Sequence, residues 1–195
     1  MKATPLLTGW TCRHLGDTAP GRPVTLPHDA MLAESRTALS AGGVNTGWYE
    51  GYDYEYQRTL TVPENELSDT HILEFEGVYH NAEVCLNGQK AALRPYGYTN
   101  FYVDCAPFLR AGDNELRVIA RNADQPNSRW YSGAGLYRPV QLWTAGDKHI
   151  LLNGVRIRTV SLEPAVVEIR VRTSAPGTVQ LMVEGLPTVR KESDG

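Results

Sequence analysis

The sequence predicts an all-β protein of the β-sandwich or jelly-roll class. Apolar and polar residues alternate with a period of two over much of the chain, which is the pattern of half-buried strands. Turn-forming residues separate the alternating runs at short intervals. No segment carries the apolar spacing of an amphipathic helix of three turns. These observations argue against βαβ architectures and favour antiparallel sheets that pack face to face.

The predicted strands follow from this alternation. Between residues 54 and 62, the large apolar side chains share one parity and the polar ones share the other. The same pattern predicts strands over residues 73–76, 82–87, 116–121 and 140–143. We expect the acidic residues of opposite parity to lie on a solvated sheet face: Glu55, Glu74, Glu76 and Glu83.

Turns and short helical segments are predicted between the strands. The dipeptide Asn87-Gly88 is a strong signal for a tight hairpin turn, and residues 111–114 form a second turn signal. Proline and polar residues at the start of a segment predict single helical turns over residues 30–35 and 63–67.

The chain is predicted to hold two β-domains. The small and polar stretch at residues 145–148 marks a boundary, which gives a first domain over residues 1–145 and a second over 146–195. Alternation resumes over residues 149–160, 166–172 and 178–184. Three or four strands are about half of an immunoglobulin-like sandwich, which needs about seven. We therefore expect a partial immunoglobulin-like sandwich, with a poorly ordered tail over residues 185–195.

Composition argues against several partners. The 195 residues carry 19 basic and 22 acidic side chains, mixed along the chain, for a net charge of −3. This distribution offers no basic surface for nucleic acid or for an anionic membrane. No apolar run approaches the roughly 18 residues of a membrane span. Residues 1–10 lack the pattern of a secretory leader, so a cytoplasmic location is expected.

The sequence predicts no metal site or cofactor. Three cysteines, Cys12, Cys85 and Cys105, have no metal-ligand spacing and are expected to be reduced thiols in a reducing compartment. A disulfide between Cys85 and Cys105 would require that their strands be neighbours. Asp124, between two asparagines, is the one position considered for Ca²⁺, although solvated loop acids are far more common.

Two segments are candidate binding loops. Residues 127–140 contain two arginines, three aromatic residues and two glycines, a set that suits sugar hydroxyls and the CH faces of sugar rings. The same residues could instead brace the fold from within. A second aromatic cluster over residues 45–56 is either a binding rim or a hydrophobic lid. No nucleophile or paired-carboxylate motif is evident, so no catalytic residue is predicted.

The order of several short motifs resembles one known family. The motifs span residues 5–145, and their order is Leu26-Pro27-His28-Asp29, Tyr56-Gln57-Arg58-Thr59, Phe75-Glu76-Gly77-Val78, Leu86-Asn87-Gly88, Gly97-Tyr98-Thr99, Gly112-Asp113-Asn114-Glu115-Leu116 and Ser128-Arg129-Trp130-Tyr131-Ser132-Gly133 through Arg138-Pro139-Val140. Together they resemble the sugar-binding N-terminal domain of family 2 glycoside hydrolases. Residues 147–184 resemble the start of that family's immunoglobulin-like domain.

The resemblance implies both a fold and a function. It implies a galactose-binding-like jelly roll that belongs to an enzyme hydrolysing terminal β-glycosides with retention, most similar to the β-galactosidases. The two catalytic carboxylates would lie in a (β/α)₈ barrel of the full-length chain, which would be the partner of this domain. The family's loops imply substrate-binding roles for Arg129, Trp130 and Tyr131, and for Asn45 and Trp48 on the neighbouring loop.

Two other functions remain open from the sequence. The chain could be a free-standing lectin-like module that binds sugar through residues 127–138. It could also be a scaffold that shapes contacts within the full-length enzyme, including those of a homo-oligomer.

Overall fold

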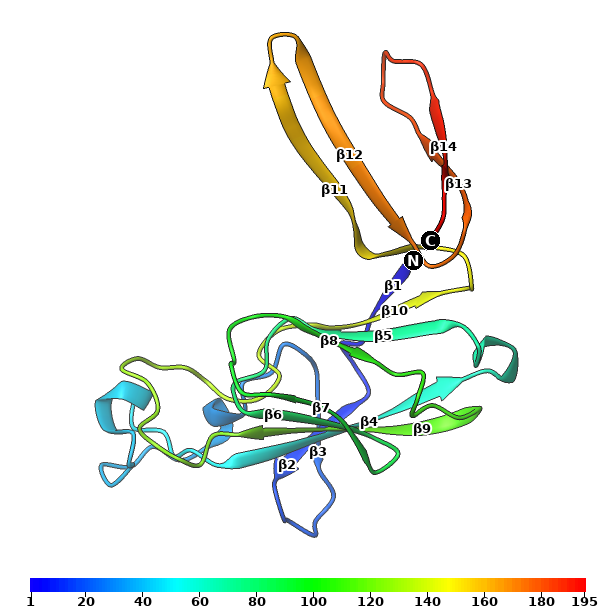
Figure 1. The fold of residues 1–195 in the computed structure, drawn as a ribbon. Coiled ribbons are helices and arrows are strands. Elements are labelled where there is room, and N and C mark those ends of the chain that lie inside the picture. The colour runs from blue at the N-terminus through cyan, green and yellow to red at the C-terminus, as the bar shows by residue number, and fades with distance from the viewer. The chain divides into compact units, whose positions relative to one another are not determined.

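The computed structural model describes all residues 1–195, and the prediction of an all-β protein is confirmed (Figure 1). Contacts divide the chain into two units. The first, the sandwich unit, holds residues 3–67 and 71–143. The second holds residues 144–195 with the short pieces 1–2 and 68–70. The domain boundary after residue 145 remains a prediction from sequence.

Two antiparallel sheets build the sandwich. One has six strands in the order β3 (Arg22–Val24), β2 (Trp10–His14), β4 (Asp53–Val62), β9 (Gly112–Arg121), β6 (Ala82–Leu86) and β7 (Gln89–Arg94). The other has four, in the order β1 (Lys2–Pro5), β10 (Val140–Ala145), β5 (Thr70–Phe75) and β8 (Phe101–Asp104).

The core lies between the inner faces of these sheets. The predicted alternation holds, because Tyr54 and Tyr56 of β4 are fully buried, as are Leu73 and Phe75 of β5. The Phe75 ring stacks on Phe101 of β8 with centroids 5.0 Å apart. Other large buried side chains come from β2, η1, β6, β9 and the loops after β5 and before β10: Trp10, Met31, Val78, Val84, Leu86, Leu116, Val118 and Leu136.

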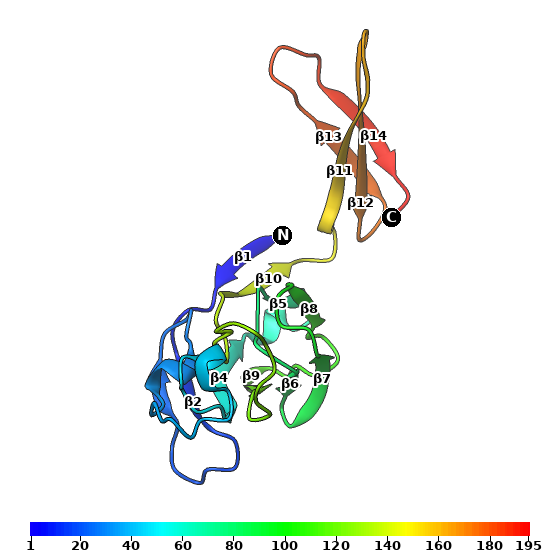
Figure 2. The ribbon, with the colours of Figure 1, turned by 90° about the vertical axis from the view of Figure 1, so that its left-hand side faces the viewer.

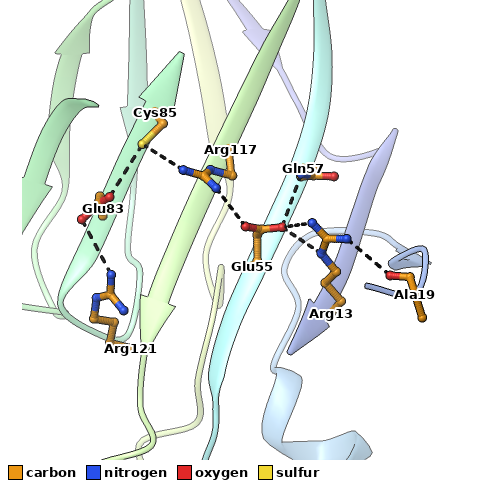
Figure 3. Close-up of polar contacts among 8 residues, drawn as sticks. All are labelled: Arg13, Ala19, Glu55, Gln57, Glu83, Cys85, Arg117 and Arg121. Carbon is orange, nitrogen blue, oxygen red and sulfur yellow. Dashed lines mark hydrogen bonds and ion pairs between the residues drawn. The ribbon is translucent and has the colours of Figure 1, made fainter. Parts of the chain in front are cut away.

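The expectation of a solvated face is wrong for Glu55. Its side chain is only 4% exposed, although it lies on the outer face of the six-stranded sheet. Arg13 and Arg117, from the strands on either side of β4, both bind its carboxylate (Figure 3). The arginine stems cover the carboxylate, and the two positive charges compensate its desolvation. Glu74, Glu76 and Glu83 are half-buried and also have hydrogen-bond partners.

The predicted turn at residues 87–88 is confirmed, whereas the one predicted over residues 111–114 is wrong, because residues 112–114 are the start of β9. Asn87 and Gly88 have φ angles of 50° and 79° and join β6 to β7 in a tight hairpin. The 3₁₀ segments η1 (Ala30–Ala33) and η3 (Glu64–Glu66) lie where helical turns were expected. A third, η2 (Gly43–Thr46), was not predicted, and neither were β1, β2 and β3.

The three cysteines are free, buried thiols. Cys85 lies in β6 of the six-stranded sheet, whereas Cys105 follows β8 of the other sheet, so their strands are not neighbours. Burial raises the pKa of the Cys12 thiol to about 11 and that of Cys105 to about 12. No helix in the structure is both long and apolar enough to cross a membrane.

The second unit consists of two hairpins. Strand β11 (Ile150–Leu162) pairs with β12 (Ala165–Thr173), and β13 (Gly177–Leu181) pairs with β14 (Val189–Ser193). Many of their apolar side chains are exposed, including Ile157 at 70%. The interpretation of these hairpins as immunoglobulin-like stays a prediction.

The expectation of a poorly ordered tail is wrong for residues 189–193. This segment forms β14, with Val189 opposite Leu181 in the register of the hairpin. The Thr178 hydroxyl of β13 donates to Glu192 over 2.7 Å. A polar, charged sequence near a chain end predicted disorder, but pairing with a neighbouring strand satisfies the backbone groups of this segment.

Candidate functional site: the aromatic end of the sandwich

Three loops meet at one end of the sandwich unit, the end that faces the viewer in Figure 2. They are the loop between β9 and β10, the segment around η2, and the connection between β7 and β8. The Tyr49 and Tyr131 rings link the first two loops, with centroids 6.1 Å apart. The Trp130 indole Nε1 donates a hydrogen bond of 2.9 Å to the Tyr98 hydroxyl, which links the β9–β10 loop to the connection between β7 and β8. We call this surface the aromatic end: Trp48, Tyr49, Tyr96, Tyr98, Trp130 and Tyr131.

The inner half of the β9–β10 loop, residues 133–138, is fixed to the sandwich. Gly135 exchanges two backbone hydrogen bonds with Tyr79, of 2.8 and 3.0 Å. The carbonyls of Ala134 and Leu136 accept from the backbone of Ala30 and His28. Residues 133–136 are buried as a result. This half of the loop therefore acts as a brace, one of the two roles that the sequence left open.

Glycine is required at two positions of the brace. Gly133 has φ of +67°, and a Cβ there would lie 2.6 Å from the Asp29 carboxylate. Gly135 has φ of +95°, and a Cβ there would overlap the Tyr56 hydroxyl. Both positions need the left-handed backbone that other residues rarely adopt and also lack space for a side chain. Arg138 completes the brace, because its guanidinium lies over the Tyr137 ring at 5.3 Å and donates to the Glu76 carbonyl.

Asp29 connects the brace to the outer half of the loop. Its Oδ1 accepts from the backbone N–H of Met31 at 3.1 Å and of Ala134 at 3.0 Å. Its Oδ2 accepts from the Tyr131 hydroxyl at 2.6 Å. The Asp29 side chain thus caps η1 and orients Tyr131 at the same time. Burial and the Asp29 carboxylate raise the pKa of Tyr131, so its phenol stays protonated and remains the donor.

The outer half of the loop, residues 128–131, faces solvent. Trp130 is 59% exposed and Tyr131 is 40% exposed. Arg129 is exposed as well, and its guanidinium forms no hydrogen bond or ion pair. An exposed indole face and a free planar fork of donors are groups that bind the CH faces and hydroxyls of sugars. Of the three residues predicted here, Arg129 and Trp130 are available to a ligand, while Tyr131 is partly committed to Asp29.

The neighbouring loop presents Trp48 in a strained conformation. Trp48 has φ of 67°, unusual for a residue with a bulky side chain, and its N–H donates to the Gly43 carbonyl at 2.9 Å. Its side chain is 40% exposed. Backbone strain of this kind persists where surrounding contacts over-determine it and often occurs at binding sites. Asn45, within η2, is half-buried, and its backbone N–H bonds to Gly42.

The residues that connect the loops of the predicted site to one another were not predicted as site residues. Tyr49 brings the Asn45 and Trp48 loop against Tyr131, and Tyr98 holds Trp130. Asp29 was noted at the start of a helical turn and within a family motif, but it was not predicted to contact the site. Its link to Tyr131 spans 102 positions in sequence, and no local pattern signals it.

The asparagines around Asp124 are used within the loop. The Asn122 Oδ1 atom accepts from Asn127 at 2.8 Å and from Gln125 at 2.9 Å. The Asn127 Oδ1 atom accepts from the Tyr79 hydroxyl at 3.1 Å. These amide oxygens therefore stabilise the loop through protein hydrogen bonds. No group of three or more His, Cys, Asp or Glu side chains converges as a metal site.

Comparisons with known proteins place the fold in a family. The profile of the family described as glycosyl hydrolase 2 galactose-binding domain-like matches residues 10–161. The β-galactosidase BoGH2A of Bacteroides ovatus is 37% identical over 161 residues, which is 77% of this chain and 19% of that protein. A putative β-glucuronidase of Formosa agariphila is 34% identical over 140 residues, or 72% of this chain and 14% of that protein.

A solved structure supports the same assignment. The crystal structure of a β-glycosidase from Bacteroides vulgatus matches with a TM-score of 0.80 at 27% identity, covering 99% of this chain and 28% of that one. This chain thus spans only a fifth or less of the two curated relatives above. The ordered motifs, the two-sheet sandwich and these matches agree: the chain belongs to glycoside hydrolase family 2, as its galactose-binding-like domain.

Proposed function

We propose that this chain is the N-terminal accessory domain of a retaining exo-β-glycosidase, and that its aromatic end closes the substrate pocket of a catalytic barrel in the same full-length protein. The observation that carries this proposal is the division of one loop into a fixed half and an exposed half. The brace over residues 133–138 requires two glycines and is fixed by buried backbone hydrogen bonds. It positions the adjacent residues Arg129 and Trp130, which are exposed to solvent. Preorganised, exposed groups of this kind lower the entropy lost on binding.

Terminal β-galactosides are the proposed substrates. The Ser128–Gly135 motif and the relative named as a β-galactosidase support this choice. A β-glucuronide substrate is the second candidate, since another relative is named as a putative β-glucuronidase. The unpaired guanidinium of Arg129 also suits a uronate carboxylate, which it could bind through two parallel hydrogen bonds. Rates of nitrophenyl β-galactoside and β-glucuronide hydrolysis by the full-length enzyme separate the two candidates.

The role of the aromatic end is tested by Trp130→Ala in the full-length enzyme. We expect kcat/KM to fall by about tenfold, which corresponds to roughly 1.4 kcal/mol of lost transition-state binding. The matched control is Leu93→Ala in β7, because Leu93 and Trp130 are both 59% exposed but only Trp130 belongs to the aromatic end. Unchanged kinetics in a folded Trp130→Ala enzyme would leave only the scaffold function.

Experiments on the isolated chain distinguish the proposed accessory domain from the lectin-like alternative. We expect the purified 195-residue chain to hydrolyse no nitrophenyl galactoside. Galactose binding that Trp130→Ala abolishes in titration calorimetry would favour a free-standing lectin-like module instead. A cytoplasmic location remains part of the proposal, and the three unpaired thiols support a reducing compartment.

A further inference from the structure

One face of the β11–β12 hairpin gathers four arginines. Arg156 lies directly opposite Arg170 in the register of the two strands, and Arg158 lies opposite Glu168. Arg172, two positions after Arg170, belongs to the same face because side chains alternate along a strand. The mixed order of charges along the sequence predicted no basic surface, but strand pairing brings these side chains together. We call this surface the arginine face: Arg156, Arg158, Glu168, Arg170 and Arg172.

The opposite face of the hairpin is apolar. There Val155 pairs with Val171, and Ile157 pairs with Ile169. An apolar face is the one that a β-domain buries, so the arginine face is the outer surface of the hairpin. Charges of both signs usually mix on such an outer surface. This one instead holds four cations and a single carboxylate.

Only part of this positive charge is compensated within the protein. The Glu168 carboxylate accepts hydrogen bonds of 3.0 and 2.8 Å from Nε and Nη2 of Arg170, and it lies 3.4 Å from Nη2 of Arg158. Arg156 and Arg172 form no ion pair. Arg156 and Arg170 are like charges directly opposite each other, an arrangement that destabilises a strand pair. A bound anion would reduce that repulsion.

The guanidinium groups are accessible and border a hollow in the surface. A depression of about 320 Å³ is lined by four residues of the arginine face and by Ile157. The side chains of Arg158 and Arg170 are 70% and 68% exposed. All cations of the hairpin are arginines, whose planar forks of donors suit carboxylates better than a lysine ammonium does. The contact between Arg170 and Glu168 is an example within the protein.

The spacing of the arginines fits an extended peptide. The arginines of β11 are two positions apart, as are those of β12, which is about 7 Å along a strand. Carboxylates at every second residue of an extended partner have the same repeat. Such a peptide can also place a neutral side chain opposite Glu168. A nucleic acid carries a negative charge at every phosphate, so it would be repelled there.

We propose that the arginine face docks an acidic segment of a partner protein, bound in extended form with Asp or Glu at alternate positions. Charge complementarity carries this proposal, because four exposed guanidinium groups, two of them without an ion pair, surround one carboxylate. The proposal depends on neither the aromatic end nor the catalytic activity of a longer protein.

The test is a fluorescence-anisotropy titration of the 195-residue chain with labelled peptides at low salt. A peptide of four glutamates that alternate with four serines should bind saturably. The same residues arranged as a glutamate block and a serine block should bind about threefold more weakly, since fewer carboxylates meet a guanidinium. Equal affinity for the two peptides would overturn the proposal, because bulk charge would then explain the binding. No binding of the alternating peptide would overturn it as well.

A nucleic acid of equal charge is the competing ligand. Pentathymidylate carries the same four negative charges as the alternating peptide, and we expect it to bind more weakly. Tighter binding of pentathymidylate would overturn the proposal in favour of a nucleic-acid surface.

Variants then locate the binding. Arg156→Gln and Arg172→Gln should each weaken binding of the alternating peptide by about two- to fivefold, the usual effect of one exposed ion pair. Neither should lower the melting temperature, because neither arginine forms an ion pair in the free chain. The matched control is Arg22→Gln in β3, which removes an exposed arginine of the sandwich unit and should leave the affinity unchanged. Unaltered affinity in both arginine-face variants, or an equal loss in Arg22→Gln, would overturn the proposal.

Discussion

The two halves of the β9–β10 loop are consecutive in sequence but opposite in surroundings. Residues 133–136 are buried, and two of them are glycines that no other residue can replace without strain. Residues 129–131 are exposed and include an indole and a guanidinium. The difference shows that one motif can carry a folding signal and a binding surface in adjacent positions. Substitutions should therefore separate stability from substrate recognition within this one loop.

The largest expected effect is that of Gly135→Ala in the brace. Its Cβ would overlap the Tyr56 hydroxyl at a φ of +95°, so we expect the sandwich to lose about 3 kcal/mol or more of unfolding free energy. Urea denaturation followed by tryptophan fluorescence measures this loss. The matched control is Gly16→Ala, with φ of +93° and nothing within 4 Å of its Cβ, which should cost only about 1–2 kcal/mol. Equal losses would mean that the contact with Tyr56 is unimportant.

Asp29→Ala should have the next largest effect, because it breaks the connection between the halves. It removes the cap of η1, the bond to Ala134 and the acceptor for Tyr131. We expect a loss of about 2 kcal/mol in the same denaturation experiment. A loss below 0.5 kcal/mol, as at ordinary surface positions, would show that Asp29 does not anchor the loop.

Tyr131→Phe should have a smaller effect, since it removes one hydrogen bond from a ring that is 40% exposed. We expect about 0.5–1 kcal/mol. Combined with Asp29→Ala, the double variant should be less destabilised than the sum of the two single variants. Strict additivity would contradict direct coupling between the Tyr131 hydroxyl and the Asp29 carboxylate.

Trp130→Ala should change stability least, by no more than about 0.5 kcal/mol, because its side chain lies mostly in solvent. The same substitution is expected to reduce the activity of the full-length enzyme. Thermal melts of the 195-residue variant give the stability change. A loss comparable to that of Asp29→Ala would place Trp130 in the brace and remove the distinction between the two halves.

The sequence predicted β4, β6 and β9 because each combines a clear alternation with a turn signal. β2 was not predicted although it is as long as β6, because the sequence Trp10–His14 shows no comparable alternation. β3 was not predicted because it has three residues and contains Pro23, which is tolerated there because β3 lies at a sheet edge. The burial of Glu55 could not be predicted, since its partners Arg13 and Arg117 are 42 and 62 positions away.

The candidate site was predicted in part. Composition indicated the segments 127–140 and 45–56, where glycines and aromatic residues cluster, and the family resemblance implied Arg129, Trp130 and Trp48 within them. Composition could not show that Tyr131 donates to Asp29, or that Tyr49 and Tyr98 join the loops. These contacts arise only when the strands are assembled, so they have no local signature.

The three buried thiols can report on local opening of the folded protein. Cys12, Cys85 and Cys105 are at most 7% exposed and lie in β2, in β6 and just after β8. A thiol reagent can alkylate them only when the surrounding strands open, and the pKa values of about 11 and 12 at Cys12 and Cys105 slow the reaction further. Labelling kinetics read by mass spectrometry would therefore rank the opening rates of three separate parts of the sandwich.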